Sequence, residues 1–331
     1  MNKCLLCKQN IADKTGSHII PSFLMKRING NGMRDHEIGF VIKKCNVDTY
    51  FGRDIYEDER KSITDNEEKI YSRENFDIKD CILCKKCEDY FGSLENKYAP
   101  SLNLKLSENT TTKNTKVSPS EALLFWCSLV WRASVTGHLG CKLHSDLEER
   151  LRISLISNNI DGLSVNYALF RCKDYAMNAG KGTAVCMDIK NNNVLLFVDE
   201  YMLVMVFDME EKEHKTNLFG IGLELKKDNL NDGKRVEEIS PLPYDLFSTL
   251  MYSVISVKAK DMIIDIRDNI KQLHRQLFKE DIPIHILREI LDLIENTGKI
   301  GDKYTIKHYV LCYKNVLIKH GLMKINKDNT F

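Results

Sequence analysis

Two pairs of cysteines constrain this chain more than any other feature of its sequence. The segment "CLLC" contains Cys4 and Cys7, and the distant segment "CILCKKCE" contains Cys84 and Cys87. A Cys-x-x-Cys turn presents two sulfurs to one ion, and two such turns complete the tetrahedral sphere of zinc. The sequence therefore predicts one structural zinc ion that joins two distant segments. Buried free cysteines are the alternative, although all four residues flank turns.

A fifth cysteine offers a competing pair, because Cys81 and Cys84 also form a Cys-x-x-Cys sequence. We prefer Cys84 with Cys87, since Glu88 would then begin a helix directly after the turn, and Cys81 would lie in a strand. A cysteine knuckle, a hairpin and a second knuckle that leads into a helix describe a treble clef. The sequence therefore predicts a zinc treble clef near the N-terminus.

Composition limits the class of protein. The 331 residues carry a formal net charge of +1 with both signs mixed, which gives no support for a broad basic surface, although a small basic patch could hold phosphate. The 11 cysteines fit thiols or metal ligands in a reducing compartment. The N-terminus lacks an apolar leader, and no apolar run reaches the roughly 20 residues of a membrane span. We expect a cytoplasmic protein that does not enter a membrane.

The chain is expected to adopt an α+β fold in three parts. Residues 1–106 would form the zinc-binding part, residues 117–240 helices with an antiparallel sheet, and residues 241–331 a helical part. The Ser, Thr and Asn composition of residues 107–118 is typical of a linker. A polar insertion at residues 29–73 is expected to be irregular.

Local patterns predict the individual elements. Ser118 is expected to cap a buried helix that starts with Pro119, and Ser145 with Glu148 to form a capping box on the next helix. Five segments predict an antiparallel meander: "NYALFRCK", "TAVCMDIK", "NVLLFVD", "YMLVMVFD" and "NLFGIGLEL". Helical spacing returns at Tyr244 in three helices, the last ended by Gly321. The apolar residues of the segments "YDLFSTLMYSVISV" and "IPIHILREILDLI" cover more than one face, so we expect burial within the chain or against another subunit. Our hypothesis is a homo-oligomer or a partner subunit.

The order of the motifs resembles the HNH endonuclease family in its zinc-stabilised form, which has a ββα-metal fold. The first knuckle, the turn "SHIIP" at residues 17–21 and the run "LCKKCE" carry this resemblance over roughly residues 1–98. The chain resembles still more closely a group of uncharacterised bacterial proteins that combine SHIIP-x-F, LLC-x-x-CE and a later "WR", here Trp131 and Arg132. The resemblance implies a metal-dependent endonuclease that acts on nucleic acid, DNA before RNA, in bacterial defence against phage.

Matching positions imply roles for individual residues. His18 stands at the family's general base, and Glu88 stands where the family binds its catalytic ion, here Mg²⁺ or Mn²⁺. A neutral imidazole is a suitable base near pH 7, and a carboxylate is a hard ligand. Two positions depart from the family: Ser17 replaces an acidic ligand, and Lys79 stands where an asparagine is expected. Glu95, on the same helix face as Glu88, is either a second carboxylate ligand or a solvated charge.

Three functions stay open at this point. The first is an HNH-like nuclease, and the second is a non-catalytic zinc-stabilised module that binds nucleic acid, a ligand or a protein. The third is an assembly subunit in which zinc is only a staple. Ser17 and the missing asparagine separate the first two functions, because they leave only Glu88, with Glu95 as a second carboxylate, to hold a catalytic ion. His18 itself could instead be a structural turn residue or a zinc ligand. The sequence contains no glycine-rich phosphate loop, G-x-S-x-G or H-E-x-x-H motif.

Overall fold

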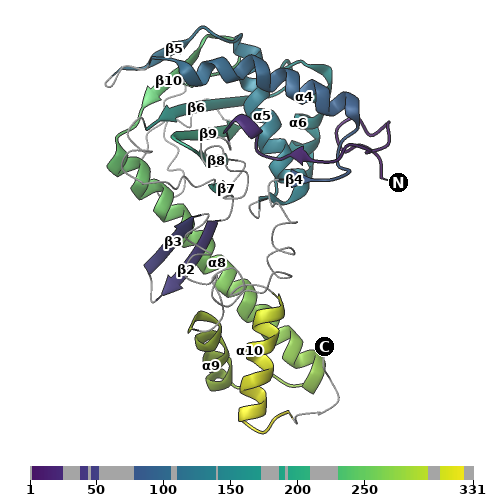
Figure 1. Ribbon diagram of the computed structural model, residues 1–331, viewed down its shortest axis with the longest axis vertical. Coiled ribbons are helices and arrows are strands. Elements are labelled where there is room, and N and C mark those ends of the chain that lie inside the picture. Colours follow the sequence, from purple (N-terminus) through teal and green to yellow (C-terminus); the bar gives the residue numbers. More distant parts are fainter. Residues whose placement is uncertain are drawn as a thin grey trace, which may run out of the picture. The chain divides into compact units, whose positions relative to one another are not determined.

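The computed structural model describes most of the chain and separates it into two compact units. It describes residues 2–24, 38–43, 46–51, 78–105, 110–138, 141–172, 186–190, 193–208, 230–296 and 306–323. Residues 1–34 and 64–254 form the first unit, and residues 35–63 and 255–331 form the second (Figure 1). These limits differ from the expected ranges 1–106, 117–240 and 241–331, because the cysteine pairs and the sheet share the first unit. The mixed α and β character expected from the sequence is present.

The first unit combines a short strand pair, a six-stranded sheet and several helices. Its elements are β1 (Ser17–His18), β4 (Ile78–Lys79), α4 (Lys85–Tyr98), a 3-10 helix (Ala99–Asn103), β5 (Thr112–Asn114), α5 (Pro119–Thr136), α6 (Ser145–Ser157), β6 (Val165–Arg171), β7 (Cys186–Lys190), β8 (Asn193–Val198), β9 (Tyr201–Phe207) and β10 (Glu237–Pro241). The strand order is β5-β10-β6-β9-β8-β7, and only the pair β10 and β6 is parallel.

The sheet contains the predicted meander in part. Strands β7, β8 and β9 follow one another as expected, but β6 pairs with β9, and β10 runs parallel to β6. The segment at residues 217–225, predicted as the fifth strand, lies outside the described residues. Strand β5 lies inside the expected linker, so that prediction is wrong for residues 112–114. Strands β5 and β10 were not predicted, because Asn114 in β5 and Glu237 in β10 are buried polar residues that hide the alternation, and Ile239 is the apolar residue buried in β10.

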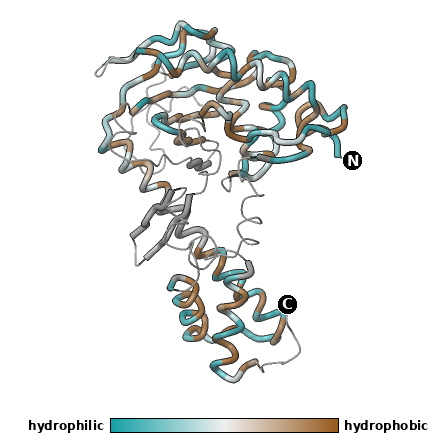
Figure 2. The backbone as a smooth tube through the Cα atoms, viewed as in Figure 1, coloured by the Kyte–Doolittle hydropathy of each residue, from teal (hydrophilic) through white to brown (hydrophobic). Residues whose placement is uncertain are grey.

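Helix α5 forms the centre of the first unit's core. Its residues from Ala122 to Ser134 are all buried, and the core extends from the N-terminal segment through α4, α5 and α6 to the sheet. In Figure 2, hydrophobic residues run through this middle region, and the short strand β5 at the edge of the sheet is hydrophilic. Trp126 and Trp131 belong to this core, as expected from their helical spacing. A large apolar core therefore holds the N-terminal segment in place.

The two predicted helix caps have different outcomes. Ser118 caps α5 as predicted, because its side chain accepts a hydrogen bond from the backbone N–H of Glu121. The capping box on α6 is wrong: Ser145 is already helical, and His144 precedes the helix without a side-chain cap bond. Glu148 instead accepts a hydrogen bond from the Ser134 hydroxyl of α5. The Glu148 carboxylate, which the local pattern assigned to the cap, therefore bonds to a residue of another helix instead.

A buried carboxylate joins the helices to the sheet. Glu237 of β10 is 1% exposed and accepts hydrogen bonds from Tyr167 at 2.8 Å, Asn114 at 2.5 Å and Trp126 at 3.2 Å. Burial raises the pKa of Glu237, and these donors oppose the rise. The four residues come from β10, β6, β5 and α5, so one carboxylate links elements that are far apart in sequence.

The second unit contains a hairpin and the C-terminal helices. Its elements are β2 (Ile38–Lys43), β3 (Asn46–Phe51), the end of α8 (Tyr244–Phe278), α9 (Ile284–Asn296) and α10 (Ile306–Lys319). The β2–β3 hairpin lies in the insertion that was expected to be irregular, so that prediction is wrong for these residues. Gly321, with φ 71°, follows α10 as predicted. No helix in the described ranges is both long and apolar enough to cross a bilayer.

The helices of the second unit bury one another's apolar faces. Ile286, Ile290 and Ile294 lie along one side of α9 and share a core with Ile270 of α8 and Leu317 of α10. In Figure 2 the tube alternates between hydrophobic and hydrophilic colours along the helices that Figure 1 labels α9 and α10. The apolar face of α9 that holds these isoleucines is therefore covered within its own unit.

Candidate metal centre and the adjoining Ser17–Glu88 site

The four predicted zinc ligands come together in the first unit. The Sγ atoms of Cys4, Cys7, Cys84 and Cys87 all lie within 4.8 Å of one another, and Cys7 and Cys84 are 3.9 Å apart. Tetrahedral zinc has Zn–S bonds of about 2.3 Å and therefore separates its sulfurs by about 3.8 Å. The donor set and its spacing fit a zinc ion. Among the described residues, no other His, Cys, Asp or Glu cluster has ligand atoms this close.

Backbone hydrogen bonds form the two cysteine turns. The N–H of Lys8 donates to the carbonyl of Cys4 at 2.9 Å, and Lys8 itself has a φ of 57°. In the second turn the N–H groups of Cys87 and Glu88 both donate to the carbonyl of Cys84 at 3.0 Å. Helix α4 therefore begins at Lys85, and not at Glu88 as predicted, because Cys84 takes the N-cap position and Cys87 lies in the first helical turn.

Cys81 lies outside the cluster. It is exposed and has a φ of 57°, and its N–H donates to the carbonyl of Lys14 at 2.8 Å. It is not a strand residue, since β4 ends at Lys79. The preference for Cys84 with Cys87 therefore agrees with the geometry, although the reason given for it, a helix starting at Glu88, does not.

The thiols differ in their readiness to ionise. Burial raises the pKa of Cys4 and of Cys87 above the ordinary value for a thiol. Burial acts in the same direction on Cys7, but backbone N–H groups, led by that of Asn10, lower the pKa of Cys7 to about 6. The side-chain amide of Asn10 donates to Cys84 at 3.5 Å, and the pKa of Cys84 is lowered in spite of its burial. Cys7 is thus poised as a thiolate, the lowered pKa of Cys84 favours the same form, and Cys4 and Cys87 would release protons to a metal ion.

Two charged residues of helix α6 contact the first cysteine turn. Arg152 donates to the carbonyl of Leu6 at 2.6 Å and pairs with Glu149, which also pairs with Lys8 of the turn at 2.7 Å. These two cations lower the pKa of Glu149 to about 2. Four thiolates around Zn²⁺ carry a net negative charge, so the nearby Arg152 and Lys8 favour the bound state electrostatically.

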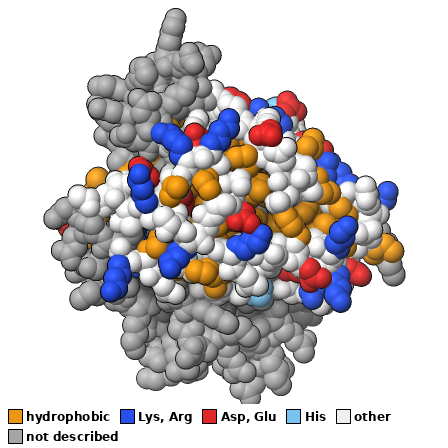
Figure 3. Space-filling view, turned by 90° about the horizontal axis from the view of Figure 1, so that it is seen from above, with side chains coloured by type: hydrophobic (Ala, Val, Ile, Leu, Met, Phe, Trp, Pro, Cys, Tyr) orange, Lys and Arg blue, Asp and Glu red, His pale blue; other side chains and the backbone are white. Residues whose placement is uncertain are grey.

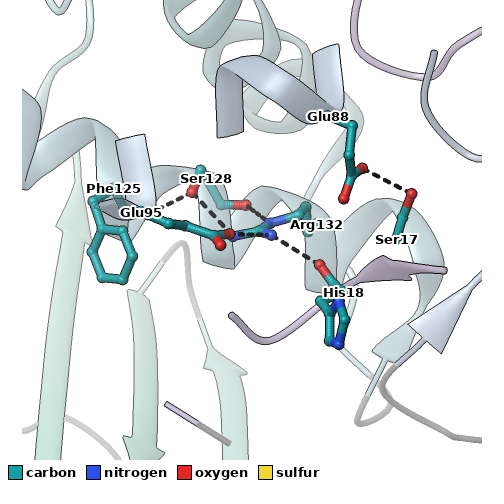
Figure 4. A network of polar contacts seen from close by, with 7 residues as sticks. All are labelled: Ser17, His18, Glu88, Glu95, Phe125, Ser128 and Arg132. Atoms are coloured by element: carbon teal, nitrogen blue, oxygen red, sulfur yellow. Dashed lines mark hydrogen bonds and ion pairs between the residues drawn. The ribbon is translucent and has the colours of Figure 1, made fainter. Parts of the chain in front are cut away.

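The strand β1 follows the first cysteine turn and leads to the second predicted site. Gly16 has a φ of 73°, a conformation that suits glycine, and its N–H donates to the carboxylate of Asp80 at 2.7 Å. Ser17 is fully buried, and its hydroxyl donates to Glu88 Oε2 at 2.8 Å (Figure 4). Among the described residues, no hydrogen bond reaches the other oxygen of Glu88. This arrangement leaves one carboxylate oxygen for an ion.

His18 and Glu88 are not aimed at each other. Ser17 and His18 are successive strand residues, so their side chains point to opposite sides of β1, and Figure 4 shows the imidazole of His18 directed away from Glu88. Strand β1 pairs with β4 and ends at His18, before the expected end at Pro21. Among the described residues, the imidazole has no hydrogen-bond partner, and it is half-buried. The structure thus brings Ser17 to Glu88 and directs His18 elsewhere.

Glu95 has a partner that the sequence analysis did not assign. Arg132 of α5, with 2% of its side chain exposed, donates to Glu95 Oε1 at 2.8 Å and to the carbonyl of His18 at 2.8 Å. The side chain of Glu95 is 17% exposed, so it is neither solvated nor turned to a metal ion beside Glu88. A charged residue inside the apolar run "SLVWRASV" was the available signal, because a buried guanidinium requires a counter-charge.

The surface around Glu88 is polar and open. A shallow depression beside α4 is lined by Lys14, Glu88, Asp89, Gly92, Ser93, Asn96 and Lys97. Among the described residues on the face drawn in Figure 3, basic and acidic side chains are interspersed with apolar ones, and no large region of one sign is visible. This pattern on the face drawn agrees with the mixed charge of the sequence.

Comparison with protein-family models, curated proteins and solved structures finds no significant match to this chain.

Proposed function

We propose that this chain is a zinc-stabilised, HNH-like endonuclease that hydrolyses a phosphodiester of nucleic acid, DNA before RNA, in bacterial defence against phage. One observation carries the proposal: β1 and the start of α4 meet beside the four-cysteine cluster, where Ser17 contacts Glu88. A cysteine turn, an antiparallel strand pair and a second turn leading into a helix follow in the order of a treble clef. The residues that match the family's base and ion positions lie at the junction of these elements.

The zinc in this proposal is structural. Four thiolates fill its coordination sphere and leave no open position for water or substrate, unlike a catalytic zinc site. It would connect the N-terminal segment to α4 and so fix the distance between β1 and the Glu88 carboxylate. Any catalytic ion must therefore be a second, harder cation.

The residues near Glu88 fit a weakly held second ion. Mg²⁺ keeps several waters and is commonly bound by one or two carboxylates together with substrate phosphates, and Glu88 supplies one such oxygen. When bound, such an ion would neutralise the charge that develops on the phosphate and on the departing 3′ oxygen. Lys14 and Lys97 in the same depression could contact neighbouring phosphates.

His18 is the proposed general base. A water oxygen would form its bond to phosphorus as the bond to the 3′ oxygen breaks, and the proton of the water would pass to the imidazole. The imidazole has no protein hydrogen bond among the described residues, so it keeps a nitrogen available for this proton. Because it points away from Glu88, the scissile phosphate would have to lie at the end of β1 to reach both groups.

The proposal predicts a loss of cleavage when the base is removed. With Mg²⁺ or Mn²⁺ and with plasmid DNA, single-stranded DNA and RNA as substrates, His18→Ala should cleave about 10²- to 10⁴-fold more slowly than the wild type. Glu88→Gln should lose activity in the same way, since an amide binds a hard cation poorly. Product formation on gels is the measurement, and zinc content should not change in either variant.

His144→Ala is the matched control, because His144 is an exposed histidine on a different element and should leave cleavage unchanged. If His18→Ala cuts as fast as the wild type, or if the wild type cuts none of these substrates with either ion, the nuclease proposal fails.

A second candidate is a non-catalytic zinc-stabilised binding module, and two contacts favour it. The Ser17 hydroxyl donates to one oxygen of Glu88, and Arg132 pairs with Oε1 of Glu95, so neither carboxylate offers both of its oxygens to an ion. Retention of nucleic acid in a gel-shift assay by a wild type that does not cleave would support this candidate. Absence of both binding and cleavage would leave the third function, an assembly subunit in which zinc has only a structural role.

A further inference from the structure

Arg132 is an unusual residue for its surroundings. It lies on α5 between residues of the apolar core, and only 2% of its side chain is exposed. Placing a guanidinium in such a site is unfavourable unless its charge is balanced and its N–H groups are hydrogen-bonded. The contacts of Arg132 therefore have to account for its presence.

These contacts converge on β1 and α4. One terminal nitrogen, Nη1, donates at 2.8 Å both to the carboxylate of Glu95 and to the backbone carbonyl of His18 (Figure 4). The remaining N–H groups turn back to Ser128 of the same helix, to its carbonyl at 3.3 Å and its hydroxyl at 3.4 Å. The guanidinium also lies 5.0 Å from the ring centre of Phe91 on α4. One side chain thus joins α5, α4 and β1.

We infer that Arg132 is a positioning residue that fixes the backbone of His18, and so the direction of its imidazole, with Glu95 as the balancing charge. Strand β1 has only two residues and one short partner strand, so its own pairing constrains it weakly. A charge-assisted bond from a rigid, buried donor supplies the missing constraint. The effect on cleavage rests on the proposed function, but the effect on the position of β1 does not.

Two measurements test the position of β1 without any assay of activity. The first is amide hydrogen exchange of residues 17–20 by mass spectrometry, and the second is the NMR signal of the His18 ring in protein with labelled histidine, assigned with His18→Ala. Arg132→Met removes all donors at similar volume and should speed exchange in this segment roughly tenfold or more. It should also move the His18 ring signal, while the zinc content stays at the wild-type level.

Glu237→Gln is the matched control. It disturbs a buried polar network in the same core that has no contact with β1, so it should lower stability and leave the His18 signal in place. Arg132→Lys keeps the charge and some donor capacity and should restore part of the wild-type signal. If Arg132→Met does not fold, Glu95→Gln keeps the acceptor oxygen and loses the balancing charge, and it should cause a smaller change at the same residues.

If Arg132→Met, or Glu95→Gln in its place, alters residues 17–20 and the His18 ring no more than Glu237→Gln does, Arg132 is only a core residue and the inference is wrong. For an active wild type, Arg132→Met should lower kcat roughly tenfold or more with little change in KM, because positioning acts on the reacting step. A wild type that cleaves nothing refutes the proposed function, and the exchange and NMR measurements still decide the role of Arg132.

Discussion

Single residues decide how this site ionises and what it can bind. The thiols were predictable from sequence, because Cys-x-x-Cys spacing is a local property of a turn. The differences between their pKa values were not predictable. The lowered pKa of Cys7 comes from backbone N–H groups that the fold places around it, and the raised pKa of Cys87 comes from burial. The role of Glu95 was not predictable either, because its partner Arg132 is distant in sequence and belongs to another helix.

The pKa differences predict how many protons zinc displaces. At pH 7.5 Cys7, with a pKa of about 6, is already a thiolate, whereas Cys4 and Cys87, with raised pKa values, are still protonated. Zinc binding should therefore release between two and three protons, and the affinity should fall about hundredfold or more for each pH unit lost below 7.5. Calorimetry in buffers of different ionisation enthalpy measures this number. Release of four protons would show that the pKa of Cys7 is not lowered.

At the scale of elements, apolar patterns predicted more than polar ones. Helix α5 and the strands β8 and β9 contain runs of buried apolar residues, and these elements were predicted. Strands β5 and β10 were not predicted, because each buries a polar residue, Asn114 or Glu237, and the burial of such a residue is favourable only with hydrogen-bond partners from other elements. Capping shows the same limit, since the start of α6 matches the pattern of a box but Glu148 bonds elsewhere.

The two caps predict different effects of the same substitution. Ser118→Ala removes the acceptor for the Glu121 N–H and should lower the free energy of unfolding by about 1 kcal/mol. Ser145→Ala, at an exposed side chain without a cap bond, should change it by less than about 0.5 kcal/mol. Denaturant titration followed by circular dichroism compares the two variants. Equal losses would mean that the capping assignments on α5 and α6 are wrong.

At the scale of the whole molecule, the cysteine cluster links chain segments that the sequence suggested would form a separate part. Leu6 and Ile19 near the cluster share one core with Trp126 of α5 and Leu203 of the sheet. The three ranges expected from sequence do not coincide with the two compact units, because linker composition shows where a chain is polar and not where its elements pack. A metal ion at the cluster would then stabilise the attachment of the N-terminal segment to this core.

Zinc content is the most direct test of the central claim that Cys4, Cys7, Cys84 and Cys87 bind one structural ion. Elemental analysis and native mass spectrometry of the purified chain should find about one zinc for each chain, in agreement with four thiolates around a single ion. Cys81→Ser, the matched control at an exposed cysteine outside the cluster, should keep this zinc, and Cys84→Ser should lose it. A wild type without zinc, or a Cys84→Ser variant that retains the ion while Cys81→Ser loses it, would contradict the account.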